Sequence, residues 1–145
     1  MPEYTSWHME YVYFGLACQE KLRGHLNDAE RAEALREIEQ GKFLLRAGFS
    51  ETGFTERYTG RLYQLCGKFE EAIPFLNASR AKLSGMELVA ADQALMVSYL
   101  KTGRKAEAVK LAENGAANAG EFAQMYRNFL AELNSKAATN VVAQP

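Results

Sequence analysis

The sequence contains two similar segments whose equivalent residues are 36 positions apart. Each has an aromatic residue, a glycine and an alanine in the same register: Tyr63, Gly67 and Ala72 in the first, and Tyr99, Gly103 and Ala108 in the second. Self-similarity at this period is typical of helix-turn-helix units, which cannot bury their apolar faces alone and must stack on neighbours. The repeat therefore predicts an all-α fold built from antiparallel helical hairpins.

Length and composition are compatible with one domain of nearly neutral charge. The chain has 145 residues, 48% of them hydrophobic, which is enough to form a core. Its net charge of −1 provides no overall field that would attract nucleic acid or an anionic membrane. The basic residues are also interspersed with carboxylates along the sequence. We therefore expect neither nucleic acid nor a membrane as a partner.

The two cysteines, Cys18 and Cys66, lie on expected helices and form no C-x-x-C motif. Because their neighbours are apolar, we expect both to be buried and reduced. No apolar run is long enough to span a bilayer, and residues 1–9 lack the basic start and apolar stretch of a signal peptide. These features predict a cytoplasmic protein.

Apolar periodicity and turn residues predict three hairpins followed by a closing helix. The hairpins are expected at residues 4–48, 54–85 and 86–119, and the closing helix at residues 121–134. These elements would form one domain over residues 1–134, followed by a flexible tail at residues 135–145. Pro74 conflicts with the fourth helix because proline donates no backbone hydrogen bond. The periodicity favours a helix that starts before Pro74 and bends there.

The first expected helix, from about Thr5 to Arg23, carries a stripe of apolar residues. The stripe consists of Tyr4, Trp7, Tyr11, Phe14, Cys18 and Leu22, at steps of three and four. We interpret most of it as core, since aromatic residues supply much of the apolar area in small helical domains. The alternative is an exposed strip that docks a partner or a second copy of the chain. The candidates for self-association are Tyr4, Trp7, Tyr11 and Tyr13, and we expect Tyr4, Val12 and Tyr13 in particular to contact a partner.

The repeated segments resemble the tetratricopeptide repeat family. The first segment matches the family pattern at Gly60, Tyr63, Gly67, Phe69, Ala72 and Leu76. The second keeps Tyr99, Gly103 and Ala108, and has Met96, Lys105 and Ala112 at the other three positions. The resemblance is good for about a quarter of the chain and partial for another quarter. It implies a right-handed array of helical hairpins, a TPR-like superhelix, in which the helix at residues 121–134 covers the last exposed face.

The resemblance also implies a scaffold that binds a peptide or a helix of a partner protein in a concave groove. The matching groove positions are Phe54, Arg57, Tyr58, Arg61 and Gln64 in one unit, and Gln93, Val97 and Lys101 in the next. Arg57 and Arg61 are four residues apart on one helix face, a spacing suited to holding an acidic segment. The alternative is that both are ordinary solvated arginines, paired with Glu56 or Glu70.

The sequence offers little basis for catalysis. The candidate metal ligands His8, Cys18 and His25 have spacings that do not place all three on one helix face. The glycines are single and lack the lysine and hydroxyl residue of a phosphate-binding loop. We therefore expect a binding protein that is not an enzyme and needs no metal or cofactor. A homo-oligomerising structural module, or a regulatory domain of a larger protein, is the alternative function.

Overall fold

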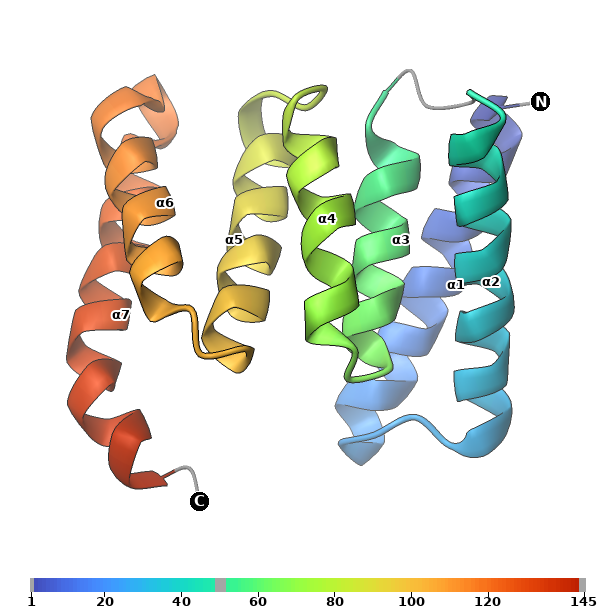
Figure 1. The fold of residues 1–145 in the computed structure, drawn as a ribbon, viewed down its shortest axis with the longest axis horizontal. Helices are drawn as coiled ribbons and strands as arrows, with labels where there is room; N and C mark the ends of the chain where they lie inside the picture. The colour runs from blue at the N-terminus through green and yellow to red at the C-terminus, as the bar shows by residue number, and fades with distance from the viewer. Residues whose placement is uncertain (1, 49–51, 144–145) are drawn as a thin grey trace. The chain divides into compact units, whose positions relative to one another are not determined.

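The computed structural model is all-α, as predicted, and its description covers the backbone of residues 2–48 and 52–143 and the side chains of residues 7–48 and 52–135. These residues contain no strand. The helices are α1 (Pro2–Arg23), α2 (Asp28–Arg46), α3 (Phe54–Leu65), α4 (Phe69–Arg80), α5 (Gly85–Lys101), α6 (Lys105–Asn118) and α7 (Ala123–Ala143), with a short 3-10 helix, η1 (Gly120–Phe122), before α7 (Figure 1). Where the sequence predicted one domain, the contacts divide the chain into two compact units, residues 1–83 (unit 1) and 84–145 (unit 2).

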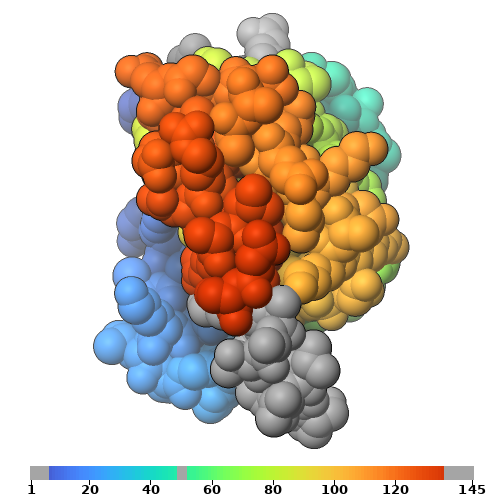
Figure 2. Space-filling model, turned by 90° about the vertical axis from the view of Figure 1, so that its left-hand side faces the viewer, coloured from blue at the N-terminus to red at the C-terminus, as the bar shows by residue number. Residues whose placement is uncertain are grey.

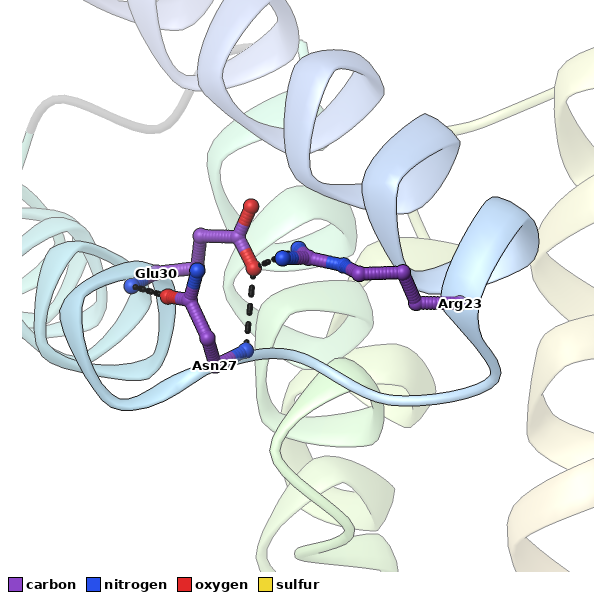
Figure 3. A network of polar contacts seen from close by, with 3 residues as sticks. All are labelled: Arg23, Asn27 and Glu30. Atoms are coloured by element: carbon purple, nitrogen blue, oxygen red, sulfur yellow. Dashed lines mark hydrogen bonds and ion pairs between the residues drawn. The ribbon is translucent and has the colours of Figure 1, made fainter.

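A capping box starts α2 (Figure 3). The side chain of Asn27 accepts a hydrogen bond from the Glu30 amide at 2.8 Å, and the Glu30 carboxylate accepts one from the Asn27 amide at 2.9 Å. Arg23 donates to the same carboxylate. The hydrogen bond from the Asn27 backbone, together with Arg23, lowers the pKa of Glu30 and favours its ionised form. Asparagine followed three residues later by glutamate is a capping-box pattern, so the sequence itself marks the start of α2.

The two repeated segments fold into the same turn. Gly67, after α3, and Gly103, after α5, are both left-handed, with φ of +74° and +77°. The equivalent hydrogen bonds run from the Lys68 amide to the Tyr63 carbonyl (2.9 Å) and from the Arg104 amide to the Tyr99 carbonyl (2.7 Å). This bonding is the Schellman motif, in which a left-handed glycine closes a helix. The period of 36 residues in the sequence is therefore a structural repeat of the helix ends.

In unit 1, α3 contacts α1, α2 and α4 (Figure 1). One core cluster of this unit consists of Met9, Val12, Tyr13, Leu16, Leu26, Ala34, Ile38, Leu44, Tyr58, Leu62 and Cys66. Small residues bring α3 and α4 close together: a Cβ at Gly60 would lie 2.8 Å from Leu76 Cγ and 3.3 Å from the Ala72 carbonyl oxygen. Ala72 itself is fully buried. These close contacts fix the hairpin of α3 and α4.

In unit 2, α6 contacts both α5 and α7. Figure 2 shows α6, in orange, beside α7, in red, on the surface of this unit. One core cluster consists of Met96, Ala108, Ala112 and Leu133, with Tyr99, Val109, Leu111, Phe129 and Leu130 packed against it. α6 continues through Asn114 and Gly115 to Asn118. Gly115 packs against the ring of Tyr126, where a Cβ would lie 2.1 Å from Cδ1, so the contact between α6 and α7 needs this glycine.

The face of α1 that enters the core is not the predicted one. Its buried residues are Met9, Val12, Tyr13 and Leu16. The predicted stripe points away from the core: Trp7 is 73% exposed, Tyr11 80%, Phe14 50% and Leu22 80%, and Cys18 is exposed. The prediction that most of this stripe is core was therefore wrong. One reason is the fit of Met9 to α2, where a Cβ at Gly41 would lie 2.8 Å from Met9 Cε.

Two predictions of helix boundaries can be compared with the structure. α4 begins at Phe69, with Pro74 inside it, which confirms the early start. α7 continues to Ala143 and does not end near Asn134, so residues 135–143 are helical where a flexible tail was expected. Ala137 and Ala138 favour the helical conformation there.

Candidate functional site

Several residues predicted to line a binding groove meet at a surface formed by α1 and α3. Arg61 donates from Nε to the Tyr13 hydroxyl at 2.8 Å, and its Nη2 donates to the same oxygen. Its Nη1 donates to Gln64 Oε1 at 3.3 Å. The guanidinium carbon also lies 5.1 Å from the centroid of the Tyr13 ring, within the range of a cation–π interaction. Arg61 is thus held by contacts to two helices.

Aromatic rings surround the two arginines. The rings of Tyr13, Phe14 and Phe54 lie 5.6, 6.2 and 6.5 Å from that of Tyr58, measured between centroids. The Arg57 guanidinium lies 5.2 Å from the same Tyr58 ring. We call Tyr13, Phe14, Phe54, Arg57, Tyr58 and Arg61 the arginine–aromatic cluster. Its two tyrosines are buried, both arginines and Phe54 are half-buried, and Phe14 is exposed. The buried rings fix the arginines, which retain access to solvent.

The positive charge of Arg61 is contacted by neutral groups. Among the residues that the structure describes, its hydrogen-bond partners are the Tyr13 hydroxyl and the Gln64 amide oxygen. The nearby carboxylate of Glu56 is buried and pairs with Lys82 Nζ at 3.0 Å. The structure therefore does not show the predicted alternative for Arg61, a solvated arginine paired with Glu56 or Glu70.

The other predicted groove residues lie in unit 2. Gln93, Val97 and Lys101 follow one another at four-residue spacing on α5, and all three are exposed. The predicted groove residues that the structure brings together are those of α3, in unit 1. Gln64, also predicted, is half-buried and accepts a hydrogen bond from Arg61.

Two of the residues predicted for self-association are exposed, and one is not. Trp7 and Tyr11 point to solvent from α1. Tyr13 is 5% exposed and holds Arg61, and Val12 is also buried. Neither is available to a partner, because both belong to the face of α1 that enters the core. The side chain of Tyr4 lies outside the described residues.

Sequence reasoning missed three buried carboxylates that have partners in the structure. Asp92 on α5 accepts a hydrogen bond of 2.5 Å from the Tyr126 hydroxyl. In unit 1, Glu37 lies 2.8 Å from His8 Nδ1, and Glu56 pairs with Lys82. For Asp92 a signal was present, since it falls three residues after Val89 on the apolar face of its helix. The three carboxylates lie on three different helices, and we interpret each as part of the packing.

The described residues show neither a metal site nor a membrane span. Among these side chains, no group of three or more His, Cys, Asp or Glu residues is placed to hold a metal ion. Within the same residues, none of the helices has both the length and the apolar character that crossing a membrane requires.

We expect Cys18 and Cys66 to differ strongly in reactivity. Cys66 is buried in the core of unit 1, and burial raises the pKa of its thiol, so little thiolate is present at neutral pH. The sequence predicted that both cysteines are buried; this is confirmed for Cys66 and wrong for Cys18, which is exposed. Iodoacetamide at neutral pH should therefore modify Cys18 quickly and Cys66 only in denaturant, as measured by peptide mass spectrometry. A Cys18→Ser variant should lose the fast reaction, and equal rates at both thiols would contradict the burial of Cys66.

The chain matches no protein-family model, no curated protein and no solved structure.

Proposed function

We propose that the protein is a TPR-like interaction module that binds an acidic segment of a partner protein and performs no chemistry on it. The common Schellman turns at Gly67 and Gly103 support an array of similar hairpins. The close contact between Gly60 and Leu76 leaves no room for a larger residue at position 60. This supports the tetratricopeptide pattern, which has a small residue at this position of α3. In this proposal the hairpins form a right-handed superhelix, and the arginine–aromatic cluster is the contact site for the partner.

The observation that carries the proposal is the fixed position of Arg61 among neutral partners. Ordering a long side chain costs conformational entropy, and here the contacts to Tyr13 and Gln64 have already ordered it. Hydrogen bonds from a guanidinium to a carboxylate are stronger than neutral ones, and they are directional. Arg57, one turn earlier on α3, supplies a second cation, while Phe14 and Phe54 supply apolar contacts. The ligand that fits is a segment with two acidic residues and an apolar side chain.

Peptide selection tests this proposal. Peptides selected on the protein from a random displayed library should be enriched in Asp and Glu, and a selected peptide should bind less tightly as the salt concentration rises. Arg57→Glu together with Arg61→Glu should weaken its binding by at least about 100-fold, because two attractive charges become repulsive. Fluorescence anisotropy with a labelled peptide measures the affinity, and circular dichroism verifies the fold.

A matched control is available on α2 of the same unit. Arg36→Glu together with Arg46→Glu produces the same change of net charge at two exposed positions outside the cluster. This control variant should bind the peptide within about threefold of the unmodified protein. If both double variants lose binding equally, only the overall charge matters and the proposed site is wrong. Selection of peptides without acidic enrichment would also contradict the proposal.

A further inference from the structure

The exposed face of α1 is a second surface, which the arginine–aromatic cluster does not explain. We call Trp7, Tyr11, Phe14, Cys18 and Leu22 the outer stripe; all five are exposed and lie opposite the buried face of Met9, Tyr13 and Leu16. Of these residues, only Phe14 belongs to the cluster. Contiguous exposed apolar patches are unfavourable in water and mark interaction surfaces.

We infer that the outer stripe binds the outer stripe of a second copy of this chain, with the two α1 helices antiparallel. The stripe is graded in size: its N-terminal half carries Trp7, Tyr11 and Phe14, and its C-terminal half carries smaller side chains. A two-fold axis between Phe14 and Gly15 places large residues opposite smaller ones. The opposed pairs are then Trp7 with Leu22, Tyr11 with Cys18 and Phe14 with Gly15, each formed twice. A graded surface of this kind is complementary to its own inverted copy.

Gly15 supports this register. It lies in the interior of α1, where glycine destabilises a helix relative to alanine. A Cβ at Gly15 would meet no atom of the chain within 4 Å, so packing within the protein does not require a glycine there. Packing of α1 against a second copy of α1 requires a glycine at this position, because the Phe14 ring of one copy then lies over the backbone at Gly15 of the other.

The charges beside the stripe favour the antiparallel direction. Glu10 and Lys21 are eleven residues, or three helical turns, apart on the same edge of the outer stripe. In the inverted pair, Glu10 of each copy lies opposite position 19 of the other, about 3 Å along the axis from Lys21. The long side chain of Lys21 spans this offset, which makes two equivalent ion pairs. In a parallel two-fold pair the shared edge of Glu10 and Lys21 would lie on opposite sides of the interface in the two copies, so neither ion pair would form. Electrostatic complementarity of this kind selects the orientation of an interface more than it sets its strength.

The exposed area of the stripe sets the expected affinity. Aromatic side chains bury about 150–250 Å² each, so the partly exposed stripes of two copies bury on the order of 1,000 Å² together. This is near the lower limit for a specific interface, and we therefore expect a dimer with a Kd of about 1–100 μM. The outer stripe shares only Phe14 with the proposed peptide site, and the variants below change other residues, so the two proposals can be tested separately.

Sedimentation equilibrium combined with tryptophan fluorescence tests the inference. Trp7 is the only tryptophan in the chain, so its emission reports the stripe directly. We expect a monomer–dimer equilibrium, with a blue shift of the Trp7 emission as the protein concentration rises. Tyr11→Glu should weaken dimerisation at least tenfold. The control Phe43→Glu alters an exposed aromatic residue on α2 and should leave dimerisation unchanged. Circular dichroism verifies that both variants are folded.

A charge exchange tests the antiparallel register. Glu10→Lys alone and Lys21→Glu alone should each weaken the dimer about three- to tenfold, because each places two pairs of like charges together. The double variant, Glu10→Lys with Lys21→Glu, should recover the original affinity. A protein that stays monomeric up to 500 μM, with constant Trp7 emission, would overturn the inference. A dimer that Tyr11→Glu does not weaken, or a charge exchange without recovery, would overturn it as well.

Discussion

Replacing Gly115 by alanine should destabilise unit 2 by about 1–3 kcal/mol, although alanine is the better helix former by roughly 1 kcal/mol. A Cβ at this position would lie 2.1, 2.3 and 2.4 Å from three carbon atoms of the Tyr126 ring. The ring cannot move aside easily, since Tyr126 is buried and its hydroxyl is hydrogen-bonded to Asp92. The added methyl group must therefore separate α6 from α7 or break that hydrogen bond. Urea unfolding followed by circular dichroism measures the loss.

Gly15→Ala is the matched control for this prediction. Gly15 also lies inside a helix, but a Cβ there meets nothing within 4 Å. The same substitution should therefore stabilise α1 by about 0.5–1 kcal/mol, measured at low protein concentration. Combining Gly115→Ala with Tyr126→Leu should cost less than the sum of the two single changes, because the residues are in contact. If Gly115→Ala also stabilises the protein, the close contact between α6 and α7 is not as described.

The helix ends could be predicted from the sequence because their causes are local. Asn27 and Glu30 cap α2 through bonds between residues three positions apart. Gly67 and Gly103 end α3 and α5 because only glycine adopts a left-handed backbone without strain. In each case the residues that fix the structure are neighbours in the sequence. The close fit of Gly115 against Tyr126 could not be predicted in this way, because Tyr126 belongs to another helix.

The buried face of α1 could not be predicted from periodicity. Apolar residues recur at steps of three and four on two opposite faces of this helix, so the pattern alone does not show which one enters the core. The choice depends on tertiary contacts. Met9 fits beside Gly41 of α2, and Tyr13 contacts Tyr58 and Arg61 of α3. None of these partners is close to α1 in the sequence.

The candidate site was predictable only in part, for the same reason. The common face of Arg57 and Arg61 follows from their four-residue spacing on one helix. The bond between Arg61 and Tyr13 joins residues 48 positions apart and depends on how α1 packs against α3. The role of Tyr13 therefore changes from a predicted partner contact to the residue that fixes Arg61.

Replacing Ala72 by leucine should destabilise the hairpin of α3 and α4 by about 1–3 kcal/mol. Ala72 is fully buried, and its carbonyl oxygen is close to the backbone of Gly60 on α3. Three extra carbon atoms have no space between the helices, so α3 and α4 must separate. The control is Ala78→Leu, at an exposed position of the same helix, which should change stability by less than about 0.5 kcal/mol. Equal melting temperatures for the two variants would contradict the packing.

Replacing the equivalent alanine of unit 2 by leucine tests whether the packing of the hairpin repeats in both units. Ala108 occupies the position 36 residues after Ala72 and is also fully buried. Ala108→Leu should therefore cost about 1–3 kcal/mol in unit 2, and its effect should add to that of Ala72→Leu, because the two sites belong to separate units. A large loss at Ala72 with none at Ala108 would mean that only the turns repeat. Similar losses at both positions would mean that each hairpin is held together at the same place by a residue that must be small.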